Sequence, residues 1–234
     1  MPPPDSSDPF DAVAEDYDRE LDRGLRLTGA GKDYFAEGRI TWVERRLGLG
    51  RDRVLEVLDF GCGTGSLLPW LRKVYPNAHY VGYDPSQASI TVAQRRHADQ
   101  GGVSFTSEAA GLKGRRFDLA FTNGVFHHIE PRDRPEALAL VRANLKPGGH
   151  FAFWENNRWN PMVHLIMSRV SFDRDAHMLF PHQARGLLRE AGFAVSSTDY
   201  LFVFPAALKP LRRVEPALAK LPLGGQYLVL AKRP

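Results

Sequence analysis

The chain has 234 residues, of which 43% are hydrophobic and 25% are charged, with a formal net charge of +4. These values are ordinary for a globular enzyme, and no apolar run approaches the roughly 20 residues that a membrane-spanning helix needs. The basic residues are dispersed and form no block interleaved with aromatic residues, which argues against nucleic acid as the partner.

The first segment, residues 1–8 (MPPPDSSD), has neither the basic start nor the apolar middle of a secretory signal, so we expect a short disordered tail and a cytoplasmic protein. The single cysteine, Cys62, cannot form an internal disulfide, which agrees with a reducing compartment. Apolar residues at helical spacing follow in FDAVAEDYDRELD and DYFAEGRITWVERRLGL. Residues 9–50 are therefore predicted to form two cap helices before the first strand.

From residue 53 onward, β-rich runs alternate with segments of helix length. In chain order, the runs are RVLEVLDF, HYVGYD, VSFTSE, FDLAFTN and HFAFWEN. Such alternation predicts parallel pairing with crossover helices on both faces of the sheet. Two later runs, SSTDYLFVF and GQYLVLAK, have no long helix between them, so we expect antiparallel pairing at the C-terminal edge. The predicted fold class is α/β, a Rossmann-like, doubly wound, mostly parallel seven-stranded sheet in a single domain over residues 9–234.

The loop in VLDFGCGTG, residues 57–65, directly follows the first predicted strand. In open parallel sheets, ligands bind outside the carboxyl ends of the strands, and bare glycines let a ligand lie against the main chain. The spacing is GxGxG and not the GxGxxG of dinucleotide sites, and the loop has no basic residue to balance a pyrophosphate. Asp59 precedes the glycines, and Asp84 ends the next strand, where a carboxylate can accept hydrogen bonds from both ribose hydroxyls. The pattern favours a cationic nucleoside without phosphate, such as S-adenosylmethionine.

Four ordered motifs carry a resemblance to a known family: VLDFGCGTG, VGYDPS, FDLAFTNGVFHHI and LKPGGHFAF. Over roughly Phe10 to Phe193, the chain resembles the class I S-adenosylmethionine-dependent methyltransferases. The resemblance implies S-adenosylmethionine as the cofactor and a set of residues around it. The implied cofactor-binding residues are Tyr17, Asp59, Gly61, Cys62, Gly63, Thr64, Gly65, Asp84, Pro85, Glu108, Ala109, Asn123 and Gly124.

The resemblance also implies where several of these residues contact the cofactor. Tyr17 would fold over it from the N-terminal helix, and Glu108 would contact the adenine amino group. Asn123 and Gly124 would lie close to the sulfonium and the methyl group. The small residues between the glycines of the loop are interpreted as loop fillers and not as reactive groups.

Methyl transfer from a sulfonium mainly requires alignment of the reacting atoms, exclusion of water and, for a protonated acceptor, removal of one proton. His128 is the first candidate base because it follows the strand end expected near the methyl group and titrates near neutral pH. His127 is the second candidate and ranks below His128, because on a helical turn its side chain would point in a different direction. A structural or positioning role is the alternative for both.

An insertion at about residues 155–182 is expected to face the substrate, because it is too long for a plain connection and mixes aromatic, Met and Asn residues. The candidate substrate-binding residues in it are Glu155, Asn156, Asn157, Trp159, Asp173 and His177. The alternative is that MVHLIMSRV is an amphipathic helix packed on the sheet. Methylases that act on nucleic-acid bases commonly carry an Asn-Pro-Pro-aromatic motif after the fourth strand, and this chain has none there, so we expect a small-molecule acceptor. We also expect no metal site, and a monomer or homodimer.

The predicted function is methyl transfer from S-adenosylmethionine to an O, N or C atom of a metabolite, sugar or lipid-linked precursor. Two alternatives stay open. The first is an NAD(P)-dependent oxidoreductase, which the glycine spacing disfavours. The second is a catalytically inactive, S-adenosylmethionine-binding regulatory module.

Overall fold

The computed structural model describes residues 28–169 and 176–234. The predicted tail at 1–8 and the first cap helix lie outside the described residues, as do the candidate site residues Tyr17 and Asp173. Within the described part of the chain, no helix is both long and apolar enough to cross a membrane.

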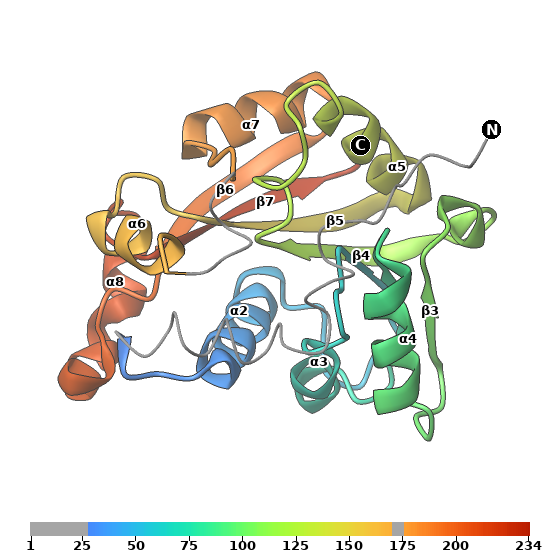
Figure 1. The fold of residues 1–234 in the computed structure, drawn as a ribbon, viewed down its shortest axis with the longest axis horizontal. Helices are drawn as coiled ribbons and strands as arrows, with labels where there is room; N and C mark the ends of the chain where they lie inside the picture. Colours follow the sequence, from blue (N-terminus) through green and yellow to red (C-terminus); the bar gives the residue numbers. More distant parts are fainter. Residues whose placement is uncertain (1–27, 170–175) are drawn as a thin grey trace.

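A seven-stranded sheet runs through the molecule in the order β3-β2-β1-β4-β5-β7-β6 (Figure 1). Its strands are β1 (Glu56–Phe60), β2 (His79–Tyr83), β3 (Val103–Thr106), β4 (Phe117–Asn123), β5 (Leu145–Asn156), β6 (Ala194–Leu201) and β7 (Gln226–Lys232). β1 to β5 pair parallel, and β7 pairs antiparallel with both β5 and β6. The chain order reverses between β1 and β4, which is where an open α/β sheet leaves a crevice for a ligand.

The predicted fold class, with an antiparallel pair at the C-terminal edge, is confirmed, and the structure refines two details. β7 lies inside the sheet and β6 forms its edge. The fifth strand begins at Leu145, before the predicted start, because Leu145 already pairs with Phe117 of β4. The helix before it ends at Asn144, so the segment LKPGG belongs to the strand.

Helices cover both faces of the sheet (Figure 1). On one side lie α2 (Lys32–Leu47), α3 (Leu68–Val74) and α4 (Gln87–Arg96), and on the other lie α5 (Arg134–Asn144) and α7 (Pro181–Glu190). The shorter elements are η2 (Ala109–Leu112), α6 (Pro161–Met167), η4 (Ala206–Val214) and α8 (Glu215–Leu218). This double cover explains why the central strands are almost continuously apolar.

Each face of the sheet has its own apolar core. Ile40 and Val43 of α2 belong to a core with Phe121 and Trp154 of the sheet. Leu138 of α5 belongs to the opposite core, whose side chains are likewise almost fully buried. The two cores fix the strands, and so fix the place of the side chains that follow their carboxyl ends.

Candidate functional site

The glycine loop after β1 has a left-handed backbone at three positions, with φ of 75° at Gly61, 51° at Gly63 and 74° at Gly65. A Cβ atom on Gly61 would lie 2.3 Å from Cγ2 of Val125, so this glycine is required by close packing. A Cβ atom on Gly63 would meet nothing within 4 Å. The loop is thus tightly packed on one side and open at Gly63.

Asp84, directly after β2, connects the second strand to the loop. Its Oδ2 accepts a hydrogen bond from the backbone N–H of Gly63 at 2.8 Å, and its Oδ1 accepts one from Ser86 at 3.0 Å. The backbone N–H groups of Gly61 and Cys62 both donate to the carbonyl of Tyr83. The Asp84 carboxylate is therefore held at the open side of the loop.

Asp59 lies beneath the loop at the end of β1 and is only 4% exposed. Its Oδ2 accepts a hydrogen bond of 2.6 Å from the hydroxyl of Tyr80. The pKa of Asp59 is raised to about 7, mainly by burial; the hydrogen bond from Tyr80 opposes the rise, and the nearby Asp84 adds to it. A cation placed next to Asp59 would stabilise its ionised form.

The side chains between the glycines point into the protein. Oγ1 of Thr64 accepts a hydrogen bond of 3.0 Å from Arg96, and Thr64 is 2% exposed. Cys62 is buried against the strand at Gly82, and burial raises the pKa of its thiol well above the usual range. Both act as loop fillers, so only their backbone can face a ligand.

Three further predicted residues lie at the outer border of this region. Glu108 and Ala109 follow β3 at the start of η2 and are exposed, as is Pro85 after β2. The backbone N–H of Glu108 donates to Oγ1 of Thr106 at 3.2 Å. These residues stand at the ends of β2 and β3, on the same edge of the sheet as the glycine loop.

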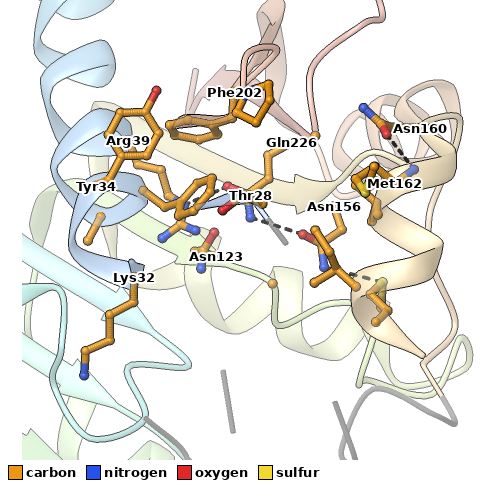
Figure 2. A pocket seen from close by; sticks show the side chains of 18 of the residues that line it. Thr28, Lys32, Tyr34, Arg39, Asn123, Asn156, Asn160, Met162, Phe202 and Gln226 are labelled. Atoms are coloured by element: carbon orange, nitrogen blue, oxygen red, sulfur yellow. Dashed lines mark hydrogen bonds between the residues drawn. The ribbon is translucent and has the colours of Figure 1, made fainter. Parts of the chain in front are cut away.

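A cavity of about 420 Å³ opens beyond the ends of β4 and β5 (Figure 2). Its walls come from α2, from α6 and from the segment after β6. Polar side chains on its surface come from Lys32, Asp33, Arg39, Asn123, His127, His128, Asn156, Asn160, Arg212 and Gln226. Apolar ones come from Phe35, Met162, Val163, Ile166, Met167, Phe202, Val203 and Phe204. The cavity thus mixes apolar surface with a few polar groups, as small-molecule sites do.

A hydrogen-bonded row of four side chains crosses one wall of the cavity (Figure 2). Nε of Arg39 donates to Oε1 of Gln226 at 2.8 Å, and Nε2 of Gln226 donates to Oδ1 of Asn156 at 3.1 Å. Nδ2 of Asn156 lies 3.6 Å from the sulfur of Met167. The row joins α2, β7, β5 and α6 and fixes the direction of each polar group.

Phe202, the first residue after β6, forms the aromatic part of the wall in a strained backbone conformation, with φ of 64°. Its ring makes edge contacts with Phe35 at 4.9 Å and Tyr34 at 5.7 Å between centroids. A Cβ atom on Gly38 would lie 2.8 Å from Cε1 of Phe202, so α2 carries a glycine at the contact. The guanidinium of Arg212 lies 3.9 Å above the Tyr34 ring.

His127 and Glu155 form a buried pair at the base of the cavity. Nδ1 of His127 donates to Oε2 of Glu155 at 2.6 Å, and the backbone N–H of Phe126 donates to Oε1 at 2.8 Å. The two side chains are 2% and 1% exposed. Since Nδ1 carries the proton, Nε2 is the ring nitrogen that can accept one.

The backbone around the pair is also fixed. Nε of Arg134 donates to the carbonyls of Phe126 and Ile129, both at 3.0 Å, and the N–H of His177 donates to the carbonyl of His127 at 2.7 Å. Burial lowers the pKa of Arg134, and the nearby Glu155 opposes this change. The histidine is therefore held from both its ring and its main chain.

A comparison with known families matches residues 58–151 to a family described as a methyltransferase domain. The family resemblance indicated by the four sequence motifs is thereby confirmed. The match covers the glycine loop, both strand-end acids and the strand that leads to His127.

The curated relatives of this methyltransferase domain match the chain over only part of their length. The ubiquinone biosynthesis O-methyltransferase of Pseudomonas fluorescens is 31% identical over 136 residues, which cover 55% of this chain and 54% of that protein. The chain spans between 24% and 54% of the length of the first curated relatives that it matches.

Two solved structures show the same fold at low sequence identity. The cyclase SpnF has a TM-score of 0.66 at 19% identity, with 96% of each chain covered. An S-adenosylmethionine-dependent methyltransferase of Mesorhizobium loti has a TM-score of 0.59 at 19% identity, with 85% of this chain and 100% of that chain covered. These likenesses concern the fold alone, and one fold can carry different reactions.

The substrate-binding residues predicted for the methyltransferase domain fall in different places. Asn156 lines the cavity, whereas Glu155 lies behind His127. Asn157 is fully buried, and its Nδ2 donates to the carbonyls of Pro222 and Gly224. Trp159 packs on other aromatic rings, and His177 is exposed; neither lines the cavity. The predicted alternative, a helix in MVHLIMSRV, is present as α6.

Sequence reasoning missed most of the cavity wall of this methyltransferase domain. Tyr34, Phe35 and Arg39 come from the second cap helix, and Phe202 and Gln226 from the C-terminal part. The usable signal was an arginine on the otherwise apolar face of the cap helix. The aromatic run LFVF just after a strand was a second signal.

Proposed function

We propose that this chain transfers a methyl group from S-adenosylmethionine to an O, N or C atom of a small-molecule acceptor, such as a metabolite, a sugar or a lipid-linked precursor. One observation carries the proposal. Asn123, which ends β4 beside the glycine loop, and Gly124, which follows it, also line the 420 Å³ cavity. A ligand on the loop and a second molecule in the cavity would therefore meet at β4, the arrangement that a transfer reaction needs.

The residues present fit the cofactor. Oδ1 of Asn123 is buried and has no hydrogen-bond partner among the described residues, as expected where a ligand supplies the donor. Gly63 is open to approach, Asp84 would accept from the ribose hydroxyls, and Asp59 would face the ammonium group of the methionine part. When bound, the cofactor supplies an electrophilic methyl group on a sulfonium.

His127 is the base that the geometry supports best. Glu155 fixes its tautomer, so Nε2 would accept the proton of an acceptor hydroxyl or amine in the cavity. The ring of His128 lies 4.1 Å from that of His127 between centroids and also lines the cavity. We therefore propose His127 as the base and His128 as a neighbour that contacts the acceptor.

Calorimetry and a transfer assay test the proposal. The protein should bind S-adenosylmethionine and S-adenosylhomocysteine but not NAD, and methyl-labelled cofactor should label a compound in a small-molecule extract. Binding of NAD in place of S-adenosylmethionine would support the oxidoreductase. Cofactor binding without turnover on any extract would support an inactive regulatory module. We expect this activity in the cytoplasm, in a monomer or homodimer.

A further inference from the structure

Exposed apolar side chains gather beside the cavity. Among the described residues, the large hydrophobic side chains with high exposure are Val54 and a group confined to residues 159–165 and 208–223. From that group we define the apolar rim as Met162, Leu165, Leu208, Leu211, Val214, Leu221 and Leu223, which are 43–51% exposed. Monomeric proteins rarely expose such a concentration of apolar surface without a function.

The rim is built on neighbouring segments. Figure 1 shows α6 and α8 at the same end of the molecule. Nδ2 of Asn160, the N-cap of α6, donates to the carbonyl of Leu223 at 3.0 Å, which joins the loop after α8 to α6. In η4, Leu211 and Val214 are three residues apart, the spacing that places side chains on one face of a 3₁₀-helix, and Leu208 stands at a kink of the same element.

The same segments form the wall of the cavity. Met162 belongs to the rim and also lines the cavity, and Val163 and Met167 continue the lining from α6. Pro205 and Arg212 line it from the side of η4. An apolar molecule that contacts the rim is thus already beside the cavity.

Charge around the rim indicates the kind of partner. Lys209 and Arg213 are exposed within η4, between the apolar residues. The only acid in the described stretch 205–223 is Glu215, which is 9% exposed and accepts a hydrogen bond from the backbone of Phe204. Lys220 is paired with the buried Asp199, which balances its charge. Apolar side chains with interleaved cations and no exposed acid are complementary to a membrane that contains anionic lipids.

We propose that the apolar rim docks on the surface of an anionic membrane and that the acceptor enters the cavity from that membrane. Docking here means contact with the headgroup region, not a spanning segment. The statement about the acceptor rests on the proposed function, whereas the docking itself does not. Entry from the membrane narrows the class of acceptor to an amphiphile whose apolar part can lie along α6 and η4.

Vesicle flotation tests the docking, with vesicles of phosphatidylcholine alone and of phosphatidylcholine mixed with phosphatidylglycerol. The full chain should bind the anionic vesicles and not the neutral ones, and added salt should weaken the binding. The variant Leu211→Glu/Val214→Glu should bind at least about 100-fold more weakly. Lys209→Ala/Arg213→Ala should bind about 20-fold more weakly. Val54→Glu, a matched change of an exposed residue outside the rim, should bind like the unchanged protein.

Several results would overturn the proposal. They are absence of binding to anionic vesicles, equal binding to neutral vesicles, or a loss of vesicle binding in Val54→Glu as large as that in Leu211→Glu/Val214→Glu. Self-association that Leu211→Glu/Val214→Glu abolishes, without vesicle binding, would assign the rim to a second copy of the chain. Calorimetry with S-adenosylmethionine on the same proteins keeps the two proposals apart. Intact cofactor binding without vesicle binding refutes the docking alone, and the reverse refutes the proposed function alone.

Discussion

Asp59 and Glu155 are both buried carboxylates at the carboxyl ends of strands, yet their hydrogen-bond partners differ. Glu155 accepts hydrogen bonds from the backbone of Phe126 and from His127, so its charge is used within the protein. Asp59 accepts its hydrogen bond from the neutral hydroxyl of Tyr80, and burial raises its pKa to about 7. The first carboxylate positions a side chain, and the second is the one that we propose faces a cationic ligand.

This difference divides the site into a half around Glu155 and a half around Asp59, and variants can test the role of each half separately. Changes at the Glu155 half should affect turnover and leave cofactor affinity nearly intact. Changes at the Asp59 half should affect cofactor affinity first. A variant that moved both quantities equally would show that the two carboxylates do not have separate roles.

The largest effect is expected for His127→Ala. Loss of a general base should lower kcat by about 10²- to 10⁴-fold, with S-adenosylmethionine affinity changed by no more than about twofold. Glu155→Gln should act in the same direction because it removes the charge that fixes the ring. Single-turnover kinetics and calorimetry measure the two quantities.

The double variant His127→Ala/Glu155→Gln provides the control. If Glu155 acts only through His127, the double variant should be no slower than His127→Ala. His128→Ala should have the smaller effect of the two histidine changes. A larger loss in His128→Ala than in His127→Ala would make His128 the base.

Asp84→Ala should weaken S-adenosylmethionine binding by about 1 to 3 kcal/mol, because hydrogen bonds to a charged acceptor are lost. The change also removes the acceptor of the Gly63 N–H, so the loop loses its hydrogen bond of 2.8 Å. Isothermal calorimetry measures the affinity, and thermal unfolding of the ligand-free protein serves as a control for folding. Unchanged affinity would remove Asp84 from the ribose contact.

The pKa of Asp59 gives a pH dependence with opposite signs for stability and binding. Its folded pKa of about 7 lies above the ordinary value of 3.8, so the folded protein holds a proton that the unfolded chain has lost between these values. The free energy of unfolding without ligand should therefore decrease as pH rises through this window. Cofactor affinity should instead increase with pH and fall about tenfold per unit below pH 7, because a cation favours the ionised carboxylate.

Asp59→Asn is the matched variant, since an amide oxygen can still accept from Tyr80 but cannot titrate. Both pH dependences should become flat in this variant. Calorimetry and denaturant unfolding between pH 5 and pH 8 measure them. A slope that persists in Asp59→Asn must come from another group.

The smallest effect is expected for Gly38→Ala. The new Cβ would press on the Phe202 ring at 2.8 Å and move it into the cavity, so the KM for the acceptor should rise about three- to tenfold. Stability should change little, because alanine favours the helix by up to about 1 kcal/mol and offsets the contact. A lower thermal midpoint with unchanged KM would mean that Phe202 only packs.

The positions of the proposed cofactor-binding residues follow local rules, so the sequence alone indicates where they lie. The turn after β1, Asp84 after β2 and Asn123 after β4 each stand directly behind a strand, and parallel strands bring such positions to one edge. The spacing of strands and helices was enough to predict the order of elements, even though β5 begins before its predicted start.

The acceptor half was harder to predict because no local rule connects its parts. Arg39, Asn156 and Gln226 come from three distant segments, and their contact depends on β7 lying next to β5. Glu155 looked like a pocket residue because it is polar at a strand end. The alternation along β5 turns its side chain to the opposite face from Asn156, where it meets His127.

The position of β7 also has a consequence for how the molecule assembles. β6 contacts the sheet only through β7, although β7 comes later in the chain. β6 therefore joins the sheet together with β7 or after it, and Phe202 and the rim residues of η4 depend on the same pairing. Hydrogen exchange should find this end of the molecule opening as one cooperative unit while the strands beside the glycine loop stay protected.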